Sequence, residues 1–173
     1  MDLFVPITMI LIAATAAATD ARTGLIPNWL TLPPLLAAPL LYLVTQGTGG
    51  LLFSLAGALA CGLVPYLLFR TGSMGGGDVK LLAALGALGG PQVGLEVELL
   101  GMTFAAAYGL FLLARRGVLR KTLLSSLLLA INIFLPARLR RPVPAAEMMP
   151  MRLGVPLFLG TAASVALGTG VVA

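Results

Sequence analysis

Two aspartates, Asp20 and Asp78, are the residues of this sequence best suited to carry out chemistry. The chain has only six acidic residues, and these two lie at the edges of apolar stretches, a long one at 3–19 and a short one at 79–89. Acidic side chains near membrane depth are costly and are functional candidates by default. A lone aspartate can also simply cap a helix. Two of them on one predicted face favour a catalytic pair over two separate caps.

The composition excludes most other hydrolytic sites. The chain has no histidine and a single cysteine, Cys61, which lies inside an apolar stretch. Ser-His and Cys-His pairs and a His-ligated zinc site are therefore impossible, and one cysteine cannot build a thiolate metal cage. We expect Cys61 to be a small packing residue, and we expect neither a metal nor a cofactor. Two carboxyl groups that share a proton can activate a water and protonate a leaving group without either.

The helix ends suggest different roles for the two acids. Asp78 begins a predicted helix, where the helix dipole favours an anion, whereas Asp20 lies in a last turn, where the dipole disfavours one. Each effect is worth about 0.3 to 1 kcal/mol. The pattern predicts Asp78 as the ionised base and Asp20 as the acid.

The bulk composition is that of a membrane protein. Of the 173 residues, 59% are hydrophobic and 10% are charged, and the mean hydropathy is +1.04. A soluble domain carries about 25% charged residues. Several apolar stretches approach or exceed the roughly 18 residues that cross a bilayer. We therefore predict an all-α polytopic fold, formed as one membrane-embedded domain over residues 1–173.

The apolar stretches predict about six transmembrane helices, at residues 3–19, 29–45, 51–69, 79–89, 94–114 and 153–173. With the N-terminus outside, this topology puts all 11 Lys and Arg residues on the cytoplasmic side, as the positive-inside rule requires. It treats 122–136 as an interfacial or re-entrant segment in a cytoplasmic loop. Asp20 and Asp78 then share the cytoplasmic face, and Glu96 and Glu98 are expected to be solvated on the other side.

The net charge of +5 fits this topology. In a chain this apolar, it indicates loops that face anionic lipid headgroups rather than a nucleic-acid partner. Helix contacts should use small residues at four-residue spacing. Such pairs are Ala56 and Ala60, Gly57 and Cys61, Ala83 and Ala87, and Gly86 and Gly90. The abundance of alanine explains the pattern equally well.

The two aspartates also lie in specific local motifs. Asp20 opens a run that ends in Ile26-Pro27-Asn28, and Asp78 closes Gly75-Gly76-Gly77-Asp78, with Lys80 two residues later. An aspartate followed by Ile-Pro-Asn, and then GxGD followed by a lysine, resembles the prepilin peptidases, or type IV leader peptidases, of the GxGD aspartyl proteases. A looser match occurs at 153–156.

The resemblance implies an activity and a site. The activity is removal of a short basic leader, ending in Gly before an apolar helix, from pilin-like precursors at the cytoplasmic face of a bacterial or archaeal membrane. Asp20 and Asp78 would be catalytic, and supporting residues for the loops or the substrate would be Gly75, Gly77, Lys80, Pro27 and Asn28. Because the sequence begins at a membrane helix, it looks like the short forms that serve Flp or tight-adherence pili.

Three alternatives stay open. One is a bifunctional peptidase that also methylates the new N-terminus. Another is a small transporter or channel in which the two acids relay protons or bind cations, since intramembrane acids mark such pathways. The nearly unbroken Leu, Ala, Gly and Val of the spans argue against that polar pathway. The third is a non-catalytic scaffold, which would tolerate loss of both acids.

Overall fold

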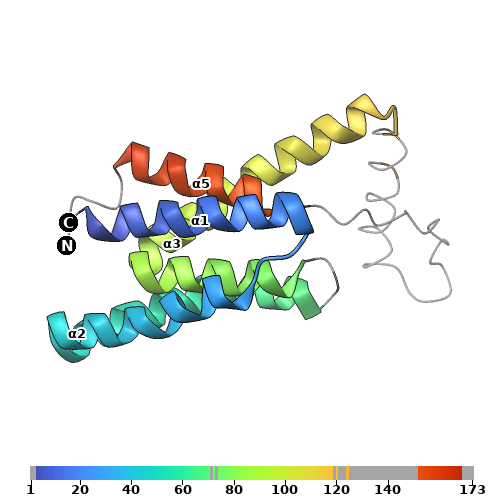
Figure 1. Ribbon diagram of the computed structural model, residues 1–173. Helices are drawn as coiled ribbons and strands as arrows, with labels where there is room; N and C mark the ends of the chain where they lie inside the picture. The colour runs from blue at the N-terminus through green and yellow to red at the C-terminus, as the bar shows by residue number, and fades with distance from the viewer. Residues whose placement is uncertain are drawn as a thin grey trace, which may run out of the picture. The chain divides into compact units, whose positions relative to one another are not determined.

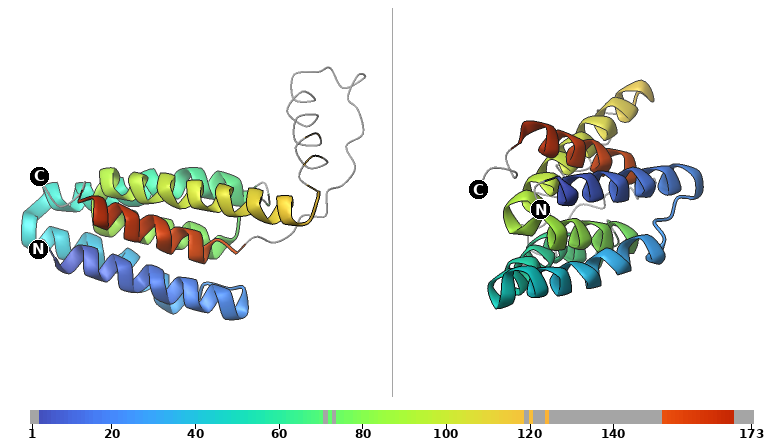
Figure 2. Two further views of the ribbon diagram at one scale, coloured as in Figure 1. Left: turned by 90° about the horizontal axis from the view of Figure 1, so that it is seen from above. Right: turned by 60° about the vertical axis from the view of Figure 1, so that its left-hand side comes forward.

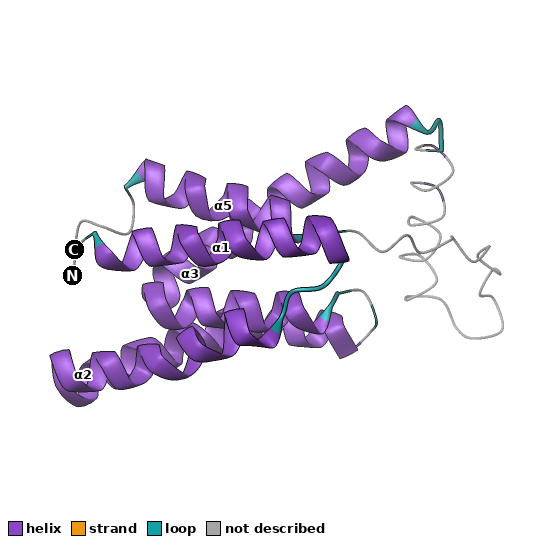
Figure 3. Cartoon of the chain, in the orientation of Figure 1, coloured by secondary structure: helices purple, strands orange, loops and turns teal. Residues whose placement is uncertain are grey.

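The computed structural model describes residues 3–70, 72, 74–118, 120, 124 and 152–168. Within these ranges the regular structure is entirely helical, which confirms the all-α prediction (Figures 1 and 3). The helices are α1 (Phe4–Thr23), α2 (Asn28–Arg70), α3 (Gly76–Arg115) and α5 (Gly154–Leu167). Apart from Leu124, the predicted interfacial segment 122–136 lies outside the described residues.

The long helices α2 and α3 each contain one glycine that breaks the helical backbone. Gly47 has φ 71° and ψ −156°, and Gly90 has φ 75° and ψ 180°, so in each case two helices join across a kink. Side chains strongly disfavour these angles, whereas glycine adopts them readily. The breaks fall at the turns expected from the sequence, and Figures 1 and 2 show the chain folding back on itself at each.

The kink at Gly90 leaves backbone carbonyls without helical partners, and two side chains from α2 satisfy them. The Tyr42 hydroxyl donates to the Leu88 carbonyl at 2.8 Å, and the Ser54 hydroxyl donates to the Ala87 carbonyl at 2.7 Å. Tyr42 and Ser54 are both buried. An unsatisfied carbonyl costs several kcal/mol in an apolar medium, so these two hydroxyls stabilise the fold-back of α3.

We expect Tyr42→Phe and Ser54→Ala each to lower the free energy of unfolding by about 1 to 3 kcal/mol, because each leaves a buried carbonyl without its donor. The matched control is Tyr66→Phe, since the Tyr66 hydroxyl accepts a bond from Arg70 that is exposed. That change should stay within about 0.5 kcal/mol. Denaturant titration in mixed micelles measures all three, and equal effects of Tyr42→Phe and Tyr66→Phe would contradict the capping role.

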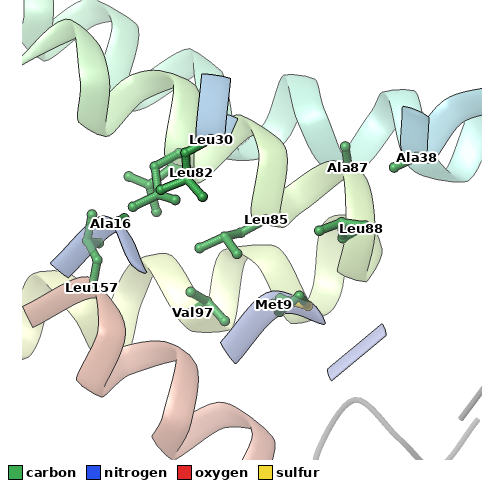
Figure 4. Close-up of a cluster of buried hydrophobic side chains, with 11 residues drawn as sticks. Met9, Ala16, Leu30, Ala38, Leu82, Leu85, Ala87, Leu88, Val97 and Leu157 are labelled. Carbon is green, nitrogen blue, oxygen red and sulfur yellow. The ribbon is translucent and has the colours of Figure 1, made fainter. Parts of the chain in front are cut away.

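The buried core is apolar and draws on every helix of the first compact unit, which comprises residues 1–105 and 152–173. Leu81, Leu82 and Leu85 of α3 belong to this core, together with Met9 of α1 and Leu157 of α5. Figure 4 shows Leu82 and Leu85 in one cluster with Met9 and Leu157. A second unit comprises residues 106–151, and in it the Arg115 guanidinium lies over the Phe111 ring at 5.3 Å.

The outer surface of the helices carries many large apolar side chains. Large side chains such as Leu11, Leu36 and Leu59 are more than half exposed. Water would disfavour this surface, whereas lipid would not. By length and composition, α1, α2 and α3 can each cross a membrane. Threonine hydroxyls on these helices bond back to carbonyls of the preceding turn, as Thr15 does to Leu11 at 2.7 Å, which hides their polarity from lipid.

Glycines allow α2 and α3 to approach within backbone contact. A Cβ atom on Gly57 would overlap the Gly86 carbonyl, and one on Gly94 would lie 2.5 Å from the Cys61 sulfur. Two of the expected small-residue pairs, Gly57 with Cys61 and Gly86 with Gly90, therefore form this contact. Ala56, from another expected pair, is exposed. Cys61 is a fully buried free thiol, in keeping with a packing role.

Candidate active site

Asp20 lies in the last turn of α1 and is only 6% exposed. Gly24 ends the helix in the left-handed conformation at φ 71°, and its N–H donates to the Asp20 carbonyl at 2.8 Å. The Asp20 side chain turns back into the protein, where its Oδ2 accepts the backbone N–H of Gly154 at 2.9 Å. The carboxyl group at this end of α1 is therefore buried and hydrogen-bonded.

Asp78 lies in the first turn of α3 and is 9% exposed. Its carboxyl group accepts the backbone N–H groups of Gly75 and of Asp78 itself, and it interacts electrostatically with Asp20. A Cβ atom on Gly75 would lie 2.8 Å from Asp78 Oδ2, so a side chain there would push this carboxyl group aside. The fold thus brings together two acids that are far apart in the sequence. Neighbouring carboxyl groups of this kind can share one proton and polarise a water.

The loops that carry the two acids contact each other. A Cβ atom on Gly77 would lie 3.0 Å from the Cβ atom of Ile26, so the glycine loop packs closely against the turn before α2. The Lys80 ammonium donates to the Asn28 side-chain carbonyl at 2.8 Å, and Pro27 accepts the Leu30 N–H at 3.2 Å. Lys80 and Asn28 therefore join the two loops, and Gly77 lies against Ile26, the residue before Pro27.

The N-terminus of α5 is a third element of the site, and the sequence indicated it only through the loose match at 153–156. Gly154 bonds the Asp20 carboxyl, and the Arg152 guanidinium donates to the Ala21 carbonyl at the end of α1. Both acids thus face the N-terminus of a helix. The dipole argument that distinguished Asp78 from Asp20 loses its force, because α5 offsets the unfavourable end of α1.

Glu98 corrects one expectation. It was expected to be solvated, but it is 5% exposed and its Oε2 atom has no hydrogen-bond partner among the described residues. Glu96 is partly buried and accepts the Ser164 hydroxyl at 3.1 Å. Across the described part of the chain, no three His, Cys, Asp or Glu residues gather as metal ligands would. Nothing in a single sequence indicates that an acidic residue outside the two motifs is buried.

Comparison with known proteins agrees with the motifs. Residues 7–110, more than half of the chain, match the model of the type IV leader peptidase family. The match includes Asp20, Asp78 and both loops and stops before α5. Searches of curated proteins and of solved structures gave no match. Because the matched region covers both motif loops, the chain belongs to the type IV leader peptidase family.

Proposed function

We propose that this protein is a membrane aspartyl endopeptidase that removes the short basic leader from type IV pilin-like precursors. Membership of the leader peptidase family supports the activity and the class of substrate. The single observation that supports an aspartyl mechanism is the pair of buried, interacting carboxyl groups on Asp20 and Asp78.

In the proposed reaction, one carboxylate removes a proton from a water, which attacks the carbonyl of the scissile peptide bond. The other carboxyl group donates its proton to the departing amine. The backbone N–H groups of Gly75 and Gly154 hold the two side chains in position for this exchange. No metal or cofactor enters any step.

We further propose six membrane crossings, with the site at the cytoplasmic face of a bacterial or archaeal cytoplasmic membrane. The breaks at Gly47 and Gly90 divide α2 and α3 into two segments each, which with α1 and α5 makes six apolar helical segments. Arg22 and Arg70 end helices, and Lys80 and Arg152 lie near helix starts, so fold-back brings these cations to one side. The positive-inside rule makes that side cytoplasmic, and Asp20 and Asp78 lie at the same helix ends.

The test is cleavage by the purified protein in lipid vesicles. The substrate is a precursor with a basic leader that ends in Gly and precedes an apolar helix. We expect two products, with the new N-terminus directly after that Gly when the products are sequenced by mass spectrometry. A precursor with this Gly replaced by Val serves as the control and should stay intact. Proton or cation flux through the vesicles without any cleavage would overturn the proposal in favour of a transporter.

A further inference from the structure

The N-terminus of α5 contacts the Asp20 side chain directly. The Gly154 N–H, the first in α5, donates to Asp20 Oδ2 at 2.9 Å, and both residues are buried. The first N–H groups of a helix have no partner within it. This bond therefore satisfies a buried donor of α5 and a buried acceptor of α1 at once, and it fixes one oxygen of the Asp20 carboxyl.

Position 154 has room only for glycine. A Cβ atom there would lie 2.8 Å from Asp20 Cβ, 3.0 Å from Asp20 Oδ2 and 3.1 Å from the Ala17 backbone. The φ angle of Gly154 is not positive, so the helical backbone at this position would accept any residue. Glycine is thus required by the limited space beside Asp20 and not by the backbone conformation at position 154.

A second contact holds the same segment in place. The Arg152 guanidinium donates to the Ala21 carbonyl, in the last turn of α1. A carbonyl there has no helical partner, and a cation is favoured beside it. Arg152 and Gly154, which flank Leu153, therefore both bind the end of α1. Gly154 contacts the Asp20 side chain, and Arg152 contacts the carbonyl of the next residue, Ala21.

We propose that Gly154 is a positioning residue for the reaction. Its N–H sets the direction of the Asp20 carboxyl toward Asp78, and its lack of a side chain allows that direction. This inference rests on the proposed peptidase function. It assigns α5 a part in the site beyond the motifs that carry Asp20 and Asp78.

The test is Gly154→Ala, with the adjacent Val155→Ala as matched control because Val155 is 45% exposed and does not bond the acid. The added methyl must displace the Asp20 side chain. A shift of about 1 Å at a reacting group can cost about a hundredfold in rate. We expect kcat to fall by about 10-fold to 100-fold in Gly154→Ala with KM changed less than twofold, and Val155→Ala to cleave like wild type.

Two further measurements keep the outcomes distinct. The infrared carboxyl band that disappears in Asp20→Asn should shift in Gly154→Ala and not in Val155→Ala. Arg152→Ala removes the second contact without adding an atom and should lower kcat by about 3-fold to 10-fold. It therefore tests the positioning role even if Gly154→Ala fails to fold.

The results separate the two proposals. Unchanged kcat and an unchanged band in Gly154→Ala would overturn the positioning role and leave the peptidase intact. A rise in KM with constant kcat would also overturn it, because that pattern marks weaker substrate binding. If wild type cleaves no precursor, the proposed function falls, while the infrared band still decides whether Gly154 sets the Asp20 side chain.

Discussion

Asp20→Asn and Asp78→Asn are each expected to slow precursor cleavage by at least about a thousandfold. An amide can neither take a proton from water nor donate one to a leaving amine, and such proton transfers contribute about 10²–10⁴-fold each. Because the two carboxyl groups act as a unit, the double variant should be little slower than either single one. Single-turnover cleavage in lipid vesicles measures all three rates.

The asparagine substitutions preserve the packing of the site. In the Asp20→Asn variant the side-chain amide would still present a carbonyl oxygen to the Gly154 N–H, so helices α1 and α5 should keep their contact. Glu98→Gln is the matched control, because Glu98 is an equally buried acid outside both motifs. It should cleave within about threefold of wild type. Full processing by a variant that lacks either aspartate would eliminate the dyad mechanism, even if the family activity itself remained.

Much of the fold follows from local signals in the sequence. A turn was predicted at 46–50 between two apolar stretches and another at 89–91, where glycines and a proline interrupt an apolar stretch. Gly47 and Gly90 in these turns adopt angles that favour glycine. The position of Asp20 in a last turn and Asp78 in a first turn was predicted from where the apolar stretches end. These features depend on neighbouring residues, and a single sequence contains that information.

Contacts between distant segments were harder to predict. Nothing near Tyr42 or Ser54 indicates that their hydroxyls cap carbonyls on the far side of another helix. The burial of Glu98 was missed for the same reason, because an acidic residue near the start of a predicted span is expected at the membrane surface. Such features depend on which helices pack together, and an apolar pattern with little periodicity does not specify that.

The candidate site contains both a feature that the sequence predicted and one that it did not. The motifs indicated that the loops carrying Asp20 and Asp78 belong together, and the contact of Lys80 with Asn28 joins those loops. The limits of the apolar stretches placed the two acids at opposite helix ends, and the helix dipole then predicted different charges for them. That distinction was weakened by α5, whose N-terminus reaches Asp20 from a distant part of the chain.

Gly57→Ala should be among the most destabilising single-methyl changes in the chain. The added Cβ would overlap the Gly86 carbonyl and lie 2.7 Å from the Gly90 carbonyl carbon. These are backbone atoms that no rotamer change can move, so α2 and α3 must separate. Overpacking of this kind costs about 1 to 3 kcal/mol and occasionally more, and we expect a loss of at least about 2 kcal/mol in the free energy of unfolding, measured by denaturant titration in mixed micelles.

Gly62→Ala tests whether this loss of stability comes from the close contact between α2 and α3 or from replacing any helical glycine by alanine. Gly62 lies in the same segment of α2, but its added Cβ would meet only the Ala83 side chain, at 3.4 Å. Replacing an uncrowded helical glycine by alanine stabilises a helix by about 0.5 to 1 kcal/mol, so this variant should be at least as stable as wild type. Equal stability of the two variants would refute the close approach. Because Asp78 lies about two helical turns from Gly86, on the segment that Gly57→Ala displaces, that variant should also lose cleavage activity under conditions where it remains folded.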